Sequence, residues 1–244
     1  MKAMRNLVAN LLTSLAQRKV DKESVTNNLF KDLSSLCRGK AQIVFDIGAH
    51  HGKYAQKINE VIAVDRFYCF EPYPPSFKQL RQSLDQNKFL TYPIALSNCK
   101  GSADFYTNHF DETNSLLPST TTNSQIDSLI APENIIQVEV DTLDSFCASH
   151  GIAQIDILKI DTQGNTYNVL NGGSDLLQRG SIKFVQCEVE FIEIYKDEQL
   201  YHRVAALMEK HSYQLYSIYN LHYDINNRLS WGDALFTRNV KRFD

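Results

Sequence analysis

Carboxylates and glycines follow several apolar segments of this chain, at the positions where α/β proteins bind their ligands. In open sheets of this class the ligand lies beyond the carboxyl ends of the strands. Five sets of residues occupy such positions: Asp46 with Gly48 to Gly52, Glu71, Ala95 to Ser97, Asp161 to Gly164, and Glu188 to Glu190. Four of the five sets contain an acid. The sequence therefore predicts a binding site rich in carboxylates.

The segment VFDIGAHHGKY, which starts at Val44, indicates what kind of ligand this is. Glycines after a strand allow a sharp turn and a close approach of the backbone to a ligand. A dinucleotide site has the pattern GxGxxG, with a pyrophosphate at the following helix N-terminus, and GAHHG lacks that pattern. Glu71 closes the next predicted strand, 23 positions after Gly48, where a carboxylate can accept both hydrogen bonds of a ribose diol.

These features describe a site for an adenosine without a pyrophosphate clamp. S-adenosylmethionine consists of an adenosine, a sulfonium cation and an amino acid tail, and its positive charge favours a pocket surrounded by carboxylates. We therefore predict S-adenosylmethionine as the cofactor. An NAD(P)-dependent oxidoreductase on a related fold is the alternative, against which the missing GxGxxG speaks.

Strand and helix patterns alternate from Lys40 onward and must position these residues. Strands are expected at 41–48, 66–72, 89–97, 155–161, 182–190, 213–220 and 233–238, with 101–107 as an added edge strand. Helices are expected at 53–60, 74–86, 166–177 and 200–212. This alternation predicts an α/β fold, with a mostly parallel sheet covered by helices on both faces. The last two strands follow one another without a helix, which predicts an antiparallel strand at the C-terminal end.

The net charge, the cysteine content and the N-terminal segment restrict the class of protein. Residues 1–40 are expected to form a helical extension before a domain at 41–244, with packing or a homodimer interface as its use. Lys and Arg are scattered and the formal charge is −3, so neither nucleic acid nor membrane is an expected partner. The five cysteines form no CxxC pair, which indicates reduced thiols and a cytoplasmic location.

An ordered set of motifs resembles the FkbM-type methyltransferases, which are S-adenosylmethionine-dependent enzymes. The motifs run from Ile43 to Glu190 and are VFDIGAHHGKY, FEPYPPSFKQL, IALSN, VDTLDSF, LKIDTQGNTYNVLNGG and CEVE. The resemblance implies a three-layer, Rossmann-like class I methyltransferase fold with a seven-stranded sheet whose C-terminal strand is antiparallel. It also implies methyl transfer to a hydroxyl of a small acceptor, such as a sugar or a natural-product scaffold.

The resemblance further assigns roles to single residues. Around the cofactor it places Asp46, Gly48 and Ala49, with Gly52 in the same loop, at the methionine part, Glu71 at the ribose, Pro72, Ala95 and Leu96 at the adenine, and Asp161 beneath the transferring methyl group. The family often has Glu where this chain has Gln163, and an acid where it has Thr166. These departures remove two potential bases or metal ligands, so a catalytically inactive cofactor-binding module is a further alternative.

Methyl transfer to a hydroxyl needs alignment first and a base second. Alignment of the acceptor with the methyl group can lower the activation free energy by about 7 to 11 kcal/mol, and a nearby base raises the rate roughly 10²- to 10⁴-fold. We favour Asp161 and Glu190 for positioning the acceptor, with His51 as the next candidate. The other candidate bases are Glu188, His50 and His222. No HxH or HxxxH spacing is present, and no metal is expected.

The polar segment from Asn108 to Asn134 carries no sustained period and resembles, by its place in the chain, a segment that covers the active site. We expect residues 113–116 to become ordered when cofactor or acceptor binds.

Overall fold

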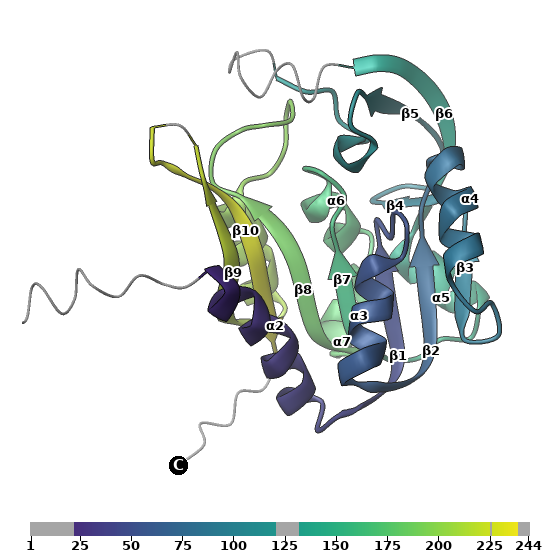
Figure 1. Ribbon diagram of the computed structural model, residues 1–244, viewed down its shortest axis with the longest axis vertical. Coiled ribbons are helices and arrows are strands. Elements are labelled where there is room, and N and C mark those ends of the chain that lie inside the picture. Colours follow the sequence, from purple (N-terminus) through teal and green to yellow (C-terminus); the bar gives the residue numbers. More distant parts are fainter. Residues whose placement is uncertain (1–21, 121–131, 225, 239–244) are drawn as a thin grey trace, which may run out of the picture.

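A twisted seven-stranded sheet forms the centre of the computed structural model, which describes residues 22–120, 132–224 and 226–238 (Figure 1). A helix expected before residue 22 lies outside the described residues. The strands stand in the order β3-β2-β1-β7-β8-β10-β9. Their bounds are β1 Lys40–Ile47, β2 Ala63–Phe70, β3 Phe89–Tyr92, β7 Ile155–Ile160, β8 Ile182–Glu190, β9 Gln214–Tyr223 and β10 Leu229–Thr237.

The direction of the last strand confirms the prediction of an antiparallel C-terminal strand. β1 pairs in parallel with β2 and β7, β2 with β3, and β7 with β8. β10 lies between β8 and β9 and runs antiparallel to both. A short turn joins β9 to β10, in which the Asp224 carboxylate accepts the backbone N–H of Arg228 and binds its guanidinium. So short a connection forces β10 to run opposite to β9.

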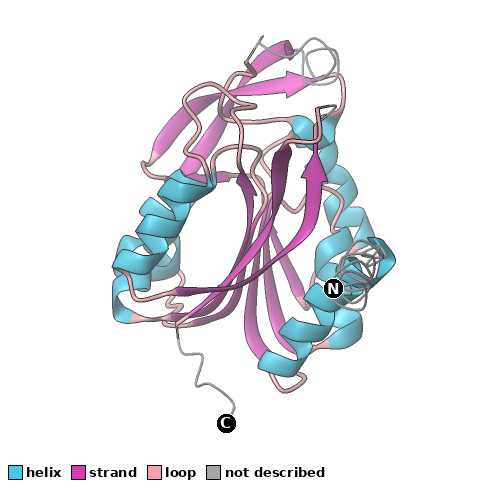
Figure 2. Cartoon of the chain, turned by 90° about the vertical axis from the view of Figure 1, so that its left-hand side faces the viewer, coloured by secondary structure: helices cyan, strands magenta, loops and turns pink. Residues whose placement is uncertain are grey.

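Helices cover both faces of this sheet and complete the expected three layers (Figure 2). The first face carries α2 Lys22–Leu36, α3 Lys53–Val61 and α4 Pro74–Ser83, and the second carries α5 Leu143–Ser149, α6 Thr166–Asn171, α7 Ser174–Arg179 and α8 Tyr201–Lys210. Strand β1 contributes side chains to the hydrophobic clusters on both faces of the sheet. Val44 packs in the first cluster, against α2, α3 and α4, while Phe45 and Ile47 pack in the second, against the helices of the other face. The described part of the chain contains no helix with the length and apolar character needed to cross a bilayer.

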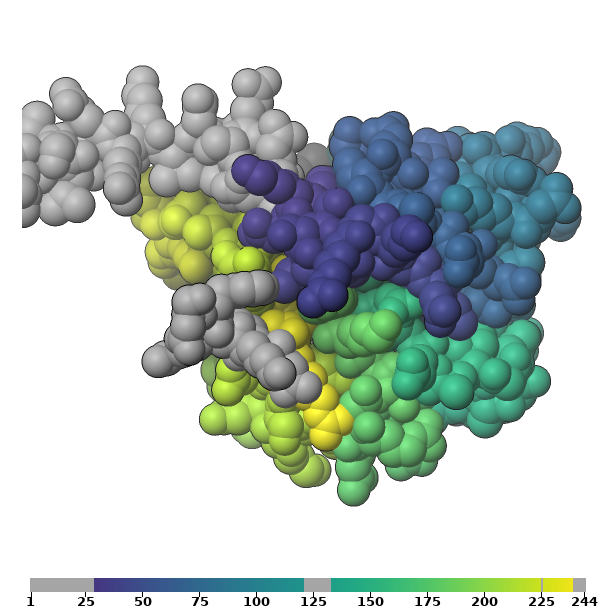
Figure 3. Space-filling view, turned by 90° about the horizontal axis from the view of Figure 1, so that it is seen from below, coloured from purple at the N-terminus to yellow at the C-terminus, as the bar shows by residue number. Residues whose placement is uncertain are grey.

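Helix α2 packs directly onto this domain, beside the C-terminal strands (Figure 3). Leu29 and Leu33 are buried in the first hydrophobic cluster, and the Tyr219 hydroxyl on β9 donates a hydrogen bond of 2.6 Å to Asp32. The described part of the expected N-terminal extension is therefore attached to the sheet. The boundary at residue 40 and a homodimer remain predictions.

A second, three-stranded sheet lies above the carboxyl ends of the main strands (Figures 1 and 2). Its order is β4-β6-β5, with β4 Ala95–Ser97, β5 Gly101–Asn108 and β6 Pro132–Thr142. The prediction of one strand at 89–97 is thus wrong. The run divides at Pro93, which has no N–H to donate to a ladder, so that β3 joins the main sheet and β4 the small one.

The helix predicted at 166–177 is also divided. It forms α6 and α7 with Gly172 and Gly173 between them, because glycine is a poor helix former. The Asp144 carboxylate on α5 accepts the backbone N–H groups of Asp175 and Leu176, which stabilises the start of the new helix.

Candidate active site

A cavity of about 330 Å³ lies between the carboxyl ends of the main strands and the small sheet. This volume is at the lower end of the roughly 300–1,000 Å³ typical of small-molecule sites. The predicted site residues that line it are Gly48, Ala49, His51, Glu71, Pro72, Ala95, Leu96 and Asp161. Three further predicted residues, Asp46, Gly52 and Glu190, are not among its lining residues. The structure therefore brings together most of the residues that the sequence singled out.

Glu71 is held in a fixed orientation on the cavity wall. The His50 backbone N–H donates to its Oε2 at 2.9 Å, and the Tyr73 backbone N–H donates to its Oε1 at 2.8 Å. Burial raises the pKa of Glu71 above its usual value, and these two backbone N–H groups oppose that rise. Each carboxylate oxygen keeps a second lone pair, so Glu71 can accept two further hydrogen bonds from a ligand.

Asp46 does not line the cavity itself but forms an ion pair with Lys159, which does. Asp46 is fully buried at the end of β1, and its carboxylate lies 2.9 Å from the Lys159 Nζ atom. Lys159 also donates to the Gly48 carbonyl at 2.8 Å and lies 3.6 Å from the Asp161 Oδ2 atom. Burial alone would lower the pKa of Lys159, but the charges of Asp46 and Asp161 hold it well above its ordinary value. Lys159 is therefore a buried cation that links two predicted site carboxylates.

The two glycines of the first loop serve packing as well as the cavity. A Cβ atom on Gly48, whose φ is 74°, would lie 1.8 Å from the Asp161 carbonyl oxygen, so the loops after β1 and β7 can approach only through a glycine. Gly52 instead precedes α3 and faces Leu80 and Leu84 at the α4 side. Its predicted role at the cofactor is therefore indirect in this structure.

Apolar side chains form a further part of the cavity wall. Phe70 ends β2 of the main sheet, Ile94 lies between β3 and β4, and Ala95, Leu96 and Phe105 belong to the small sheet. The Leu96 carbonyl accepts a hydrogen bond from the Asn165 side chain, which ties β4 to the loop before α6. A flat apolar ring system fits such a wall.

Gln163 connects the two carboxyl groups at the carboxyl ends of β7 and β8. Its Nε2 atom donates to the Asp161 Oδ1 atom at 3.1 Å and to the Glu188 Oε2 atom at 2.9 Å. The Tyr195 hydroxyl lies 2.9 Å from the Gln163 Oε1 atom and fixes the amide. Burial raises the pKa of Glu188 well above its usual value, and the charges of Asp161 and Glu190 add to the rise.

Glu190 lies behind the cavity wall and is 2% exposed. Burial and the charge of Glu198 raise its pKa to about 8, and the Gly164 backbone N–H opposes the rise. Burial likewise raises the pKa of Glu198 to about 7. Glu188, two residues earlier on the same strand face, lines the cavity in its place.

The described part of the polar segment 108–134 covers this site. Residues 111, 112, 114 and 116 line the cavity, and the helical turn η1 spans Asp111–Thr113. The Ser115 hydroxyl donates to the Gln163 carbonyl at 2.6 Å, and the Tyr195 hydroxyl lies 3.0 Å from the Thr113 carbonyl. This segment therefore contacts the loop that follows Asp161, although its ordering on ligand binding remains a prediction.

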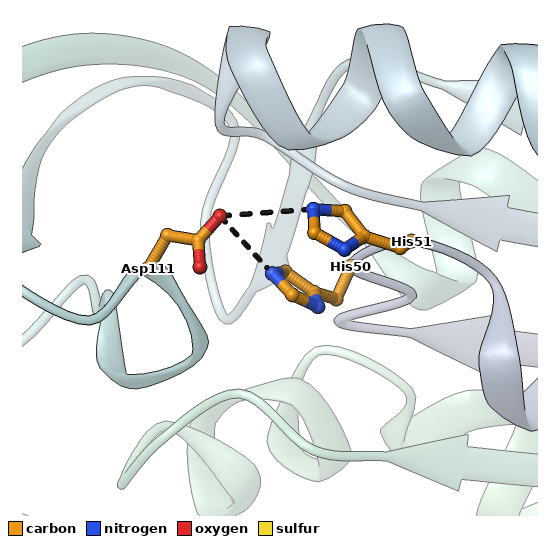
Figure 4. Close-up of side chains that lie close together, drawn as sticks. All are labelled: His50, His51 and Asp111. Carbon is orange, nitrogen blue, oxygen red and sulfur yellow. Dashed lines mark ion pairs between the residues drawn. The ribbon is translucent and has the colours of Figure 1, made fainter.

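His50 and His51 stack on one another at the cavity wall, with a centroid distance of 3.6 Å, and both face Asp111 (Figure 4). Burial lowers the pKa of His51, and the neighbouring His50 adds to this effect. His222, the third candidate histidine, stacks on Trp231 and is not among the cavity-lining residues.

With this geometry established, comparison with known proteins defines the family. The Methyltransferase FkbM domain matches residues 46–215 of the sequence, well over half of the chain. The chain belongs to the FkbM methyltransferase family. It is 25% identical over 215 residues to the 2-O-methyltransferase NoeI of Sinorhizobium fredii strain NGR234, which covers 82% of this chain and 85% of that protein.

Two solved methyltransferases are similar to this FkbM methyltransferase in structure. Magnesium protoporphyrin IX methyltransferase of Synechocystis PCC 6803, solved with bound S-adenosylmethionine, has a TM-score of 0.50 and 8% identity over 89% of this chain and 79% of its own. An FkbM methyltransferase of Methylobacillus flagellatus has a TM-score of 0.46 and 13% identity over 82% of this chain, which spans 44% of that protein. The fold is the Rossmann-like class I methyltransferase fold, as predicted.

Sequence reasoning missed two residues of the candidate site, namely Lys159 and Asp111. Lys159 gives a usable signal, because a lysine inside the buried strand ILKI requires a partner charge. Asp111 begins the short helical turn η1 in a polar segment, and no local pattern indicates that it meets the loop after β1.

Proposed function

We propose that this FkbM family member is an S-adenosylmethionine-dependent O-methyltransferase that methylates a hydroxyl of a small acceptor, such as a sugar or a natural-product scaffold. The observation that carries this proposal is the buried Glu71 carboxylate, which lines the cavity and whose two oxygens each accept one backbone hydrogen bond. The acceptor class rests on NoeI, which is named as a 2-O-methyltransferase.

The residues of the cavity fit this cofactor. Glu71 would accept the two ribose hydroxyls, and Pro72, Ala95 and Leu96 would contact the adenine. Gly48 and Ala49 would lie at the methionine part, with Lys159 and Asp46 supporting their loop from below. When bound, S-adenosylmethionine supplies an electrophilic methyl group on a sulfonium.

Asp161 is the residue we propose for the acceptor hydroxyl. Its side chain is 44% exposed and lines the cavity, while Gln163 holds its Oδ1 atom and Lys159 lies near its Oδ2 atom. A carboxylate fixed in this way can align the hydroxyl for in-line attack and take its proton as the new oxygen–carbon bond forms. Glu190 would act as a positioning residue through Gly164, and His51 would lie at the cavity wall as a further polar contact.

A methyl-transfer assay tests the proposal. The full chain is incubated with S-adenosylmethionine carrying a labelled methyl group and with a panel of sugars and hydroxylated natural products. We expect labelled product from at least one acceptor, and a loss of at least about 100-fold in turnover for Asp161→Asn. Asp175→Asn, an exposed acid on α7, is the matched control.

Calorimetry of cofactor binding separates the alternatives. Binding of S-adenosylmethionine without NAD or NADP binding supports the proposal, whereas binding of a nicotinamide cofactor alone contradicts it. Cofactor binding without product from any acceptor, including extract of the native source, would indicate the inactive cofactor-binding module.

A further inference from the structure

Three side chains from two separate segments direct ligand-type atoms at one point of the cavity wall (Figure 4). His50 and His51 belong to the loop after β1, and Asp111 belongs to η1. The Nε2 atoms of His50 and His51 lie 3.1 Å and 3.7 Å from the same Asp111 oxygen, Oδ2. One ligand atom from each of the three residues lies within 4.8 Å of the others.

These separations suit a metal ion. Zinc binds imidazole nitrogen and carboxylate oxygen at about 2.0 to 2.2 Å, so the ligand atoms of a tetrahedral site lie roughly 3.4 Å apart. The two nitrogen–oxygen distances lie on either side of that value. Both Nε2 atoms are removed from solvent, and both lie against the Asp111 Oδ2 atom. In the tautomer without a proton on Nε2, each ring offers a lone pair beside that carboxylate.

The surroundings hold the backbone of the His50 loop and the Asp111 carboxylate in place. His50 has a left-handed backbone, with φ of 48°, and its N–H is bonded to Glu71, which fixes the start of the loop. The Ser76 hydroxyl on α4 donates to the Asp111 Oδ2 atom at 2.9 Å. A second hydrogen bond to a ligating carboxylate is a usual feature of protein metal sites, because it orients the ligand.

We propose that His50, His51 and Asp111 bind a divalent transition-metal ion of the zinc class at the wall of the cavity. Two imidazoles and one carboxylate favour Zn²⁺, Co²⁺, Ni²⁺ or Fe²⁺ over Mg²⁺ or Ca²⁺, which prefer oxygen ligands. Three protein ligands leave at least one coordination position open. That position adjoins the cavity that Asp161 also lines, so an oxygen of the acceptor can occupy it.

Binding requires a small change in the two rings. They stack with an interplanar angle of 23°, whereas a metal–nitrogen bond lies near the plane of its own imidazole. The rings must therefore swing apart to place both lone pairs on one ion. No step of the proposed methyl transfer depends on this ion, so the two proposals can fail independently.

Metal titration of the full chain, without a polyhistidine tag and after treatment with a chelator, tests the site. We expect one Zn²⁺ per chain by calorimetry and one Co²⁺ per chain with the visible absorption of a low-coordinate site. Asp111→Asn and His51→Gln are each expected to weaken Zn²⁺ binding by at least about 100-fold. His109→Gln is the matched control, because His109 is exposed and contacts a single carboxylate, Glu133.

Thermal unfolding in chelator shows whether each variant is folded before its affinity is interpreted. If Asp111→Asn is unfolded, His51→Gln and His50→Asn decide the matter, since asparagine tolerates the left-handed backbone of residue 50. The proposal is overturned if the wild type binds no Zn²⁺ or Co²⁺, or if folded ligand variants bind as tightly as wild type and the His109→Gln control.

Discussion

Replacing Glu190 with glutamine is expected to change how the stability of the protein depends on pH. Burial and the charge of Glu198 raise the pKa of Glu190 from 4.5 to about 8 in the folded protein. The unfolded chain releases the same proton near the ordinary value of 4.5. Between these pKa values the folded form keeps a proton that the unfolded form has lost, so Glu190 makes the folded form less stable as pH rises.

The size of the effect follows from this pKa difference. One pKa unit corresponds to about 1.4 kcal/mol, so the rise from 4.5 to about 8 sets an upper limit of about 5 kcal/mol. Glu198, whose pKa is about 7, titrates in the same range and influences Glu190. We therefore expect Glu190→Gln to recover about 2 kcal/mol of unfolding free energy at about pH 8 relative to about pH 5.

Urea denaturation between about pH 5 and about pH 9 measures these free energies. The difference between Glu190→Gln and wild type should grow with pH and become constant above the folded pKa of about 8. Glu209→Gln, which removes an exposed carboxylate from α8, controls for the loss of one charge. A difference that stays the same at every pH would show that Glu190 does not titrate as the buried geometry requires.

Three further changes test other parts of the site. Glu71→Ala should weaken S-adenosylmethionine binding about 10- to 100-fold in calorimetry, since charge-assisted hydrogen bonds contribute about 1.5 to 3 kcal/mol; an unchanged affinity would reassign that carboxylate. Gly48→Ala should lower the free energy of urea unfolding by about 2 kcal/mol or more, because its Cβ would meet the Asp161 carbonyl at 1.8 Å; wild-type stability would contradict the close approach. Tyr195→Phe removes the hydroxyl near Gln163 and Thr113, so limited proteolysis should cut residues 108–120 faster than in wild type, and S-adenosylmethionine should slow the cut in both; identical cleavage in all samples would argue against an ordered cover.

The main sheet could be predicted because its strands carry their own signal. β1 and β8 contain apolar residues that are buried on both faces of the sheet, and their ends carry the acids that the sequence places beyond parallel strands. The antiparallel position of β10 followed from the missing helix between the last two strands. Glu71 and Asp161 line the cavity because strand ends meet at one edge of the sheet.

The small sheet and the covering segment were less predictable. β3 and β4 are separated by only Pro93 and Ile94 yet belong to different sheets, a choice made by distant partners and not by local pattern. Asp111 meets His50 across some sixty positions of chain, and no spacing rule relates them. We favoured Glu190 over Glu188 from the sequence, but Glu188 is the one that lines the cavity. Both lie on one strand face, and the sequence does not show that the loop at Gly164 contacts Glu190.

The walls of the cavity belong to two separate β-sheets. Asp161 directly follows β7 and Glu188 lies near the end of β8, both in the seven-stranded sheet, whereas Ala95, Leu96 and Phe105 belong to the three-stranded sheet. Substitutions of Phe105 can therefore reshape the apolar side without displacing Asp161 or Glu188. A scaffold divided in this way can diversify its apolar wall while keeping its acidic groups, and varying Phe105 is a rational route to altered selectivity.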